Sequence, residues 1–162
     1  GEVAITSPSQ GGTIISLRFP RATEDADDDA PTGQAADVAA IEARGEVVLL
    51  VEDDSGVRHI VHRQLLKLGY QVHLADDAVG ALAMIDDGLA FDLLLTDVIM
   101  PRGMSGFELG GAVRERTSAP VIYMSGNHAP AGQPLHDDAL VLPKPVPQNE
   151  LAVALRAALD LR

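Results

Sequence analysis

From Glu46 to the end of this 162-residue chain, short apolar runs alternate with segments whose apolar residues recur at helical spacing. Short apolar runs bounded by turn residues are typical of buried strands, and apolar residues three and four positions apart are typical of helices. The expected strands cover residues 47–51, 71–75, 92–96, 121–124 and 140–142, and the expected helices run from 54 or 55 to 68, 77–87, 107–116 and 147–161. Because successive parallel strands need a helical crossover, this alternation predicts an α/β fold with a parallel sheet and helices on both faces.

Polar side chains stand at the ends of four of these strands. Glu52 and Asp53 follow the first strand, Asp97 the third, Ser125 the fourth and Lys144 the fifth. Because the carboxyl ends of parallel strands share one edge of the sheet, where ligands bind, we expect these side chains to meet. Acids, a hydroxyl and a lysine in this order favour a magnesium-assisted site that accepts a phosphoryl group.

The three acids define the expected chemistry of this site. Clustered carboxylates repel one another unless a cation neutralises them, and Mg²⁺ suits a site of carboxylates, waters and a phosphate oxygen. We expect Asp53 and Asp97 to bind Mg²⁺ directly, Glu52 to bind it through water, and a backbone carbonyl just after Asp97 to complete the protein ligands. Lys144 would then offer positive charge and Ser125 a hydroxyl donor to the phosphoryl oxygens, with the Asp97 carboxylate as nucleophile.

Each of these residues also has a plainer interpretation. Asp53 or Asp54 alone would suit a helix N-cap, and Asp97 would suit an ordinary turn. Ser125 could belong to a turn, and Lys144 to a solvated loop. The functional interpretation depends on the complete set, in this order, within a five-strand repeat.

Composition excludes several classes of protein. The net charge of −12, with only 12 scattered Lys and Arg residues, disfavours a nucleic-acid partner, because phosphate neutralisation needs clustered cations. The chain has no cysteine, so it can form neither disulfides nor thiolate metal sites. No apolar run approaches the roughly 18 residues that cross a bilayer, and the first residues do not resemble a signal peptide. We expect a cytoplasmic protein without direct membrane contact.

The first 45 residues differ from the rest of the chain. Alternating apolar residues within residues 1–22 predict a β-hairpin with its turn at residues 9–12. Residues 23–45 are rich in Ala, Asp, Glu, Pro and Gly and include the acidic run at residues 24–29. Such a composition predicts a flexible acidic linker. The expected domain that follows covers residues 46–162.

Four motifs point to a family: Leu49-Leu50-Val51-Glu52-Asp53-Asp54, Leu94-Leu95-Thr96-Asp97-Val98-Ile99-Met100-Pro101, Met124-Ser125-Gly126 and Leu142-Pro143-Lys144-Pro145. Through them, the chain from about Glu46 to Leu161 resembles the receiver domain of two-component response regulators. The resemblance implies a flavodoxin-like fold with sheet order 2-1-3-4-5. It implies that Asp97 accepts a phosphoryl group from a phosphohistidine and that Ser125 turns inward to bond it. It further implies Mg²⁺ ligation by Glu52, Asp53, Asp97 and the Ile99 carbonyl, and a cis peptide between Lys144 and Pro145.

The first 22 residues are similar to the last hairpin of the ATP-binding domain of sensor histidine kinases, through Val3-Ala4-Ile5-Thr6-Ser7, Gly11-Gly12-Thr13 and Leu17-Arg18-Phe19-Pro20. Gln10 stands where the first glycine of that pattern is usual, and the other ATP-binding motifs are missing. The similarity implies the C-terminal part of a hybrid histidine kinase whose parent chain is a protein-histidine kinase. The fragment itself has no kinase active site, so the catalysis expected of it is its own phosphorylation on Asp97. The implied partners are the histidine kinase domain of the parent chain, a histidine phosphotransfer protein, or both.

Two departures from the family pattern bear on signalling. Residues 126–136 contain two prolines and two glycines, which makes a poor helix where receivers place their fourth helix. We therefore expect this segment to be short, irregular or mobile. Val141 stands where the family tends to have an aromatic residue three positions before the lysine. We therefore expect the domain to pass phosphate onward or to regulate its own kinase, without dimerising tightly when phosphorylated.

Other functions fit the sequence less well. A degenerate receiver that only binds a protein is disfavoured by the intact acid pair, Asp97, Ser125 and Lys144. A Mg²⁺ phosphohydrolase with an aspartyl-phosphate intermediate needs a second aspartate two residues after the nucleophile, where Ile99 stands. A nucleotide-binding fold needs a glycine-rich loop after its first strand, where residues 52–56 are Glu-Asp-Asp-Ser-Gly.

Overall fold

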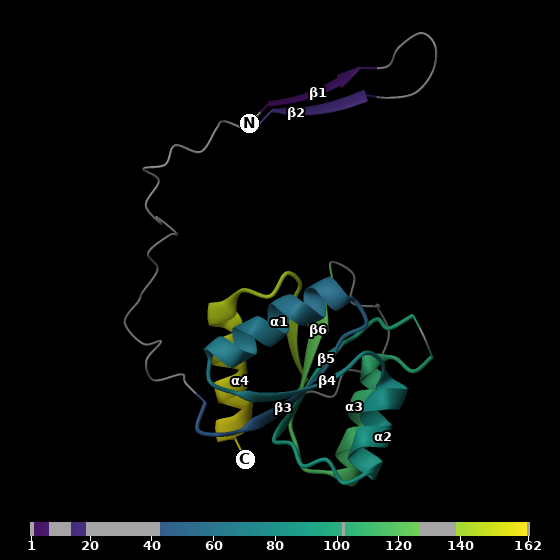
Figure 1. Ribbon diagram of the computed structural model, residues 1–162, viewed down its shortest axis with the longest axis vertical. Helices are drawn as coiled ribbons and strands as arrows, with labels where there is room; N and C mark the ends of the chain where they lie inside the picture. The colour runs from purple at the N-terminus through teal and green to yellow at the C-terminus, as the bar shows by residue number, and fades with distance from the viewer. Residues whose placement is uncertain (1, 7–13, 19–42, 102, 127–138, 162) are drawn as a thin grey trace. The chain divides into compact units, whose positions relative to one another are not determined.

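The computed structural model describes residues 2–6, 14–18, 43–101, 103–126 and 139–161 (Figure 1). The chain divides into two compact units, residues 1–35 and 36–162. The predicted turn at residues 9–12 and the predicted linker up to residue 42 lie outside the described residues. Of the segment 126–136 that we expect to be irregular, only Gly126 is described.

The first unit contains the predicted hairpin. Strand β1 (Glu2–Thr6) pairs antiparallel with β2 (Ile14–Arg18), with Val3 opposite Leu17 and Ile5 opposite Ile15. The expected strand pair is therefore confirmed. Its origin in a histidine kinase remains a prediction.

The second unit holds a five-stranded parallel sheet. Its strands are β3 (Val47–Val51), β4 (Gln71–Ala75), β5 (Leu93–Asp97), β6 (Val121–Ser125) and β7 (Leu140–Pro143). They lie in the order β4-β3-β5-β6-β7, which is the predicted order 2-1-3-4-5 within this unit. The flavodoxin-like α/β fold is confirmed.

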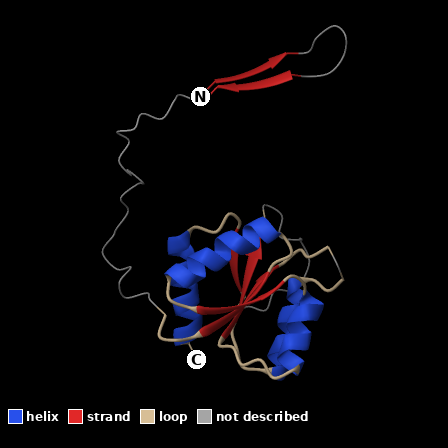
Figure 2. Ribbon diagram, viewed as in Figure 1, coloured by secondary structure: helices blue, strands red, loops and turns tan. Residues whose placement is uncertain are grey.

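Helices cover both faces of the sheet, as Figures 1 and 2 show. Helices α1 (Ser55–Lys67) and α4 (Gln148–Asp160) pack on one face, where Leu65 and Leu155 join the core. Helices α2 (Ala78–Asp86) and α3 (Gly106–Arg116) pack on the other face. The central strands β5 and β6 are buried along their whole length, because both of their faces are covered. None of the helices in the described part of the chain is long and apolar enough to span a membrane.

Local signals in the sequence fix the helix ends. The Asp54 side chain caps α1 by accepting hydrogen bonds from the Gly56 and Val57 amides at 2.8 and 2.9 Å. Gly69, just beyond the end of α1, has a φ of 86°, which glycine adopts without strain. Ser105 and Glu108 form a reciprocal capping box at the start of α3.

Several boundaries differ from the predicted ones by one residue. Strand β5 begins at Leu93, and the side chain of Asp92 just before it accepts a hydrogen bond from the Val47 amide at 2.9 Å. It extends to Asp97, which pairs with Met124 of β6. Pro147, expected in the first turn of the last helix, is instead its N-cap residue with extended backbone.

Glu46 and Arg156 connect the start of the sheet to α4. Arg156 Nη1 lies 2.8 Å from Glu46 Oε1, and Arg156 Nη2 lies 3.1 Å from Asp160 Oδ1. Burial alone would raise the Glu46 pKa, but hydrogen bonds from Arg156 and from the Arg44 amide outweigh it and hold that pKa below its usual value. The carboxylate form of Glu46 therefore stabilises the fold.

We expect this contribution to disappear in acid. A carboxyl group whose pKa is lowered on folding stabilises the protein above its unfolded pKa, about 4.3 for Glu, and loses this effect as the pH falls through the folded pKa. Glu46→Gln should therefore be less stable than wild type at about pH 7, and the difference should shrink below about pH 4.3. Urea unfolding at both pH values measures this, with the exposed Glu115→Gln on α3 as control. An equal difference in the free energy of unfolding between Glu46→Gln and wild type at both pH values would contradict this prediction.

Candidate functional site

The carboxyl edge of the sheet gathers the five predicted side chains. Glu52 and Asp53 follow β3, Asp97 ends β5, Ser125 ends β6 and Lys144 follows β7. Strand β5 lies between β3 and β6, and Ser125 pairs with Pro143 of β7, so neighbouring strands bring these positions side by side. The fold therefore places all of them where the sequence predicts a site.

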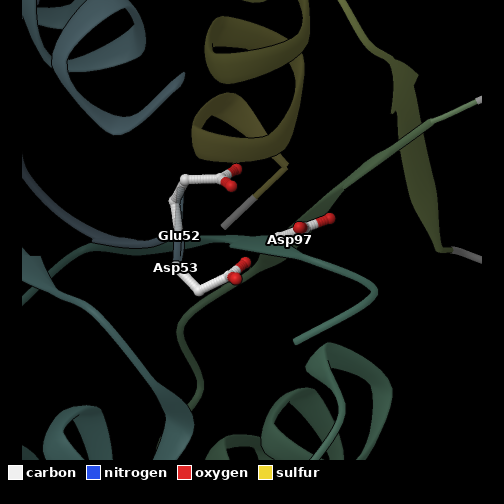
Figure 3. Close-up of side chains that lie close together, drawn as sticks. All are labelled: Glu52, Asp53 and Asp97. Atoms are coloured by element: carbon white, nitrogen blue, oxygen red, sulfur yellow. The ribbon is translucent and has the colours of Figure 1, made fainter. Parts of the chain in front are cut away.

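The three acids form a compact cluster, shown in Figure 3. Glu52, Asp53 and Asp97 each offer a carboxylate oxygen, and these oxygens lie within 4.8 Å of one another. Glu52 is fully buried and Asp97 is 7% exposed, whereas Asp53 is half-buried. Three negative charges this close, two of them shielded from water, require positive charge nearby.

Lys144 supplies part of that charge. Its Nζ lies 2.5 Å from Glu52 Oε2 and 2.8 Å from Asp97 Oδ2, so one ammonium group joins the strand ends of β3 and β5. The Lys144 amide donates to the Ser125 carbonyl at 2.6 Å, which fixes the backbone that carries the side chain. The Lys144–Pro145 peptide is cis, as the family resemblance implies.

Burial and charge shift two pKa values at this edge. Burial raises the pKa of Glu52, and the nearby Lys144 ammonium only partly offsets that effect. Burial alone would lower the pKa of Lys144, but its contacts with Asp97 and Glu52 outweigh this and raise the pKa. Lys144 therefore stays charged at neutral pH.

Backbone groups orient the acids. The Ile99 amide donates to Asp97 Oδ1 at 3.3 Å, and the Asp54 amide donates to Glu52 Oε1 at 3.3 Å. The buried Thr96 hydroxyl donates to the Asp97 carbonyl at 3.0 Å. The backbone of Ile99 thus lies beside Asp97, while metal ligation by the Ile99 carbonyl remains a prediction.

Ser125 is buried at the end of β6, with 3% of its surface exposed. Its hydroxyl donates to the carbonyl of the next residue, Gly126, at 3.1 Å. The hydroxyl is therefore engaged within its own loop. Bonding to a group on Asp97 would require the hydroxyl to give up this hydrogen bond.

The donor set fits Mg²⁺. All three clustered side chains offer hard carboxylate oxygens, which Mg²⁺ prefers to nitrogen or sulfur. Lys144 is the cation that contacts Glu52 and Asp97, so among these four groups two negative charges remain for a divalent ion to balance. The acid cluster therefore offers the donor atoms and the negative charge that Mg²⁺ requires.

Two residues that shape this site were not predicted from the sequence. Arg58, in α1, donates to backbone carbonyls of the acid-bearing loop. Gly106, the first residue of α3, lies so close to Asp97 that an added Cβ would be 1.9 Å from the Asp97 carbonyl oxygen. Arg58 could have been found from the sequence, because a cation near the predicted start of a helix needs a negative partner nearby. The close approach of Gly106 to Asp97 could not have been found, because no local sequence pattern indicates a contact between residues nine positions apart.

Comparisons with known proteins identify the family. Residues 48–156 match the response regulator receiver domain. The transcriptional regulatory protein CpxR of Escherichia coli (strain K12) is 34% identical over 117 residues, covering 69% of this chain and 48% of CpxR. The response regulator MprA of Mycobacterium avium is 35% identical over 116 residues, covering 69% of this chain and 50% of MprA. The chain spans about half the length of these curated relatives.

Solved structures agree with this assignment. The receiver domain of the hybrid histidine kinase CckA superposes with a TM-score of 0.59 at 32% identity, covering 70% of this chain and 98% of that one. The chemotaxis protein CheY4 of Vibrio cholerae superposes with a TM-score of 0.61 at 28% identity, covering 71% of this chain and 99% of that one. The family match over residues 48–156 agrees with the fold and with the acid cluster. The chain therefore belongs to the response regulator receiver domain family.

Proposed function

We propose that residues 46–162 accept a phosphoryl group on Asp97 from a phosphohistidine, in a reaction that depends on Mg²⁺. The observation that carries this proposal is the double contact of Lys144 Nζ, 2.5 Å from Glu52 and 2.8 Å from Asp97, beside three carboxylates that converge within 4.8 Å. An acceptor carboxylate, a cation-binding acid pair and a fixed ammonium group are the parts that phosphoryl transfer requires.

Each residue has a defined part in this reaction. An Asp97 carboxylate oxygen attacks phosphorus and forms the new O–P bond, while the N–P bond of the phosphohistidine breaks and its electron pair returns to the imidazole nitrogen. Lys144, already beside Asp97, donates to a phosphoryl oxygen, and Ser125 rotates away from Gly126 to donate to another. Glu52, Asp53, Asp97 and the Ile99 carbonyl would hold Mg²⁺, which when bound supplies positive charge to the phosphoryl oxygens. Water slowly hydrolyses the resulting aspartyl phosphate.

We propose that this receiver belongs to a hybrid histidine kinase in the cytoplasm. The hairpin of residues 1–22 would be the end of its ATP-binding domain, and residues 23–45 an acidic linker. The structural likeness to the receiver of the hybrid histidine kinase CckA supports this context. The phosphate donor would be the parent kinase or a histidine phosphotransfer protein.

Phosphorylation of Asp97 is directly measurable. We expect incubation with acetyl phosphate and Mg²⁺ to add one phosphoryl group to the wild-type chain, as read by intact mass, and we expect EDTA to prevent it. Asp97→Asn should abolish the modification because it removes the nucleophilic carboxylate. Asp76→Asn is the matched control, since Asp76 is an exposed aspartate just after β4 at the same edge of the sheet.

The same experiment separates the proposal from its alternative. A wild-type chain that stays unmodified while Mg²⁺ is present would favour a degenerate receiver that acts as a protein-interaction module. Equal modification of wild type and Asp97→Asn would place the phosphoryl group on another residue.

A further inference from the structure

Arg58 connects helix α1 to the loop that carries two of the three clustered acids. Its Nη1 donates to the Glu52 carbonyl at 2.5 Å and to the Asp53 carbonyl at 3.3 Å. The side chain is half-buried. One nitrogen therefore holds two consecutive carbonyls at the point where the backbone turns from β3 into α1.

These carbonyls lie where the sheet pairing ends. The Glu52 amide still donates to the Ala75 carbonyl of β4 at 3.2 Å, but beyond it the chain leaves the sheet for α1. A buried carbonyl without a partner is costly, and a fixed donor determines the orientation of its peptide group. The orientation of these peptide groups sets the directions in which the Glu52 and Asp53 carboxylates leave the backbone.

The position of Arg58 in its helix points to the same role. A cation near the start of a helix faces the positive end of the helix dipole and needs negative charge nearby, and α1 has no acidic residue in its first turn after the N-cap Asp54. The Asp54 carboxylate and the two loop carbonyls, with the acid cluster beyond them, provide that negative charge. Elsewhere in α1, Arg63 and Lys67 are exposed.

We infer that Arg58 is a positioning residue for the metal site: it acts through the Glu52 and Asp53 backbone and aligns their carboxylates for a divalent cation. This inference rests on the proposed function, because it takes Mg²⁺ as the ion held by the acid cluster. Groups that orient metal ligands typically change metal affinity by about 10- to 100-fold when removed.

The sign of the effect distinguishes positioning from simple charge. Arg58→Met removes a positive charge close to the acids, so electrostatics alone would tighten Mg²⁺ binding. Loss of positioning would weaken it. We expect Arg58→Met to raise the Mg²⁺ Kd by about tenfold, measured by isothermal titration calorimetry and by the shifts of the backbone amides of residues 52–54 and 97–99 in NMR spectra.

Two variants complete the experiment. Arg58→Lys keeps one donor nitrogen on a long side chain, and we expect it to recover part of the lost affinity. Arg63→Met removes a charge from the same helix without touching the loop, and we expect a Mg²⁺ Kd equal to or slightly below that of wild type. If Arg58→Met does not fold, Arg58→Gln, whose side chain is too short to reach both carbonyls, replaces it in the same comparison.

Unchanged or tighter Mg²⁺ binding by folded Arg58→Met, with normal binding by wild type, would overturn this inference alone. A change in unfolding temperature without a change in Kd would likewise mark Arg58 as a purely structural residue. Absence of Mg²⁺ binding by the wild type would overturn both this inference and the proposed function.

Discussion

Gly106→Ala is expected to lower the free energy of unfolding by about 3 kcal/mol or more, which is large for the addition of one methyl group. Its Cβ would lie 1.9 Å from the Asp97 carbonyl oxygen and 2.8 Å from the Asp97 carbonyl carbon. Both atoms belong to the backbone at the end of β5, so a side-chain rotation cannot relieve the overlap. Either the start of α3 or the strand end that carries Asp97 must shift.

The same helix provides a matched control. An added Cβ at Gly111 would have no atom within 4 Å, apart from its own helix and chain neighbours. Gly111→Ala should therefore raise stability by about 0.5–1 kcal/mol, because alanine favours the helix more than glycine does. Urea unfolding followed by circular dichroism measures both variants. Equal stability of Gly106→Ala and wild type would show that the backbone around Asp97 yields easily.

Those features of the fold that depend on neighbouring residues in the chain were predictable from the sequence. Asp54 caps the start of α1 and Gly69 follows its end with a positive φ, as their residue types predict. Both are local properties of the chain. The sheet order follows from the resemblance to receivers. The last residue of β5 was not predictable. Asp97 extends the strand by pairing with Met124 of β6, and the register between two strands cannot be read from the residues around Asp97.

Glycine in α3 illustrates the same limit. From sequence alone, Gly110 only weakens the helix. In the structure an added Cβ there would lie 2.1 Å from the Tyr123 hydroxyl oxygen, and the Tyr123 ring packs against Phe107 with centroids 4.8 Å apart. The glycine makes room for a buried aromatic ring of β6. A tertiary contact of this kind cannot be read from helix propensity.

The candidate site was predictable as a set of residues but not in all of its contacts. Strand ends carry Asp97, Ser125 and Lys144 to one edge, as the alternation of strands and helices implies. The sequence predicts that Lys144 serves the phosphoryl oxygens. The structure adds that its ammonium group already contacts both Glu52 and Asp97, so we expect Lys144 to contribute to stability as well.

Lys144→Met is accordingly expected to lower the free energy of unfolding by about 2–4 kcal/mol when Mg²⁺ is absent. The substitution leaves the fully buried Glu52 and the nearly buried Asp97 without the ammonium that contacts both. Removing one partner of a buried ion pair costs about 3–5 kcal/mol, and the lower value here allows for the 18% exposure of the Lys144 side chain. Urea unfolding in EDTA measures the loss.

Magnesium should restore part of this stability. A cation that binds only the folded state raises the free energy of unfolding. The increase grows with the logarithm of the ratio of free cation concentration to Kd once that ratio is well above one. Because Lys144→Met removes a competing positive charge from the acid cluster, we expect Mg²⁺ to stabilise this variant more than it stabilises wild type. Lys67→Met, at the exposed end of α1, is the control and should change neither stability nor its response to Mg²⁺ by more than a few tenths of a kcal/mol. If Lys144→Met behaves like Lys67→Met, the ammonium does not hold the acids together, and the divalent ion alone must balance their charge.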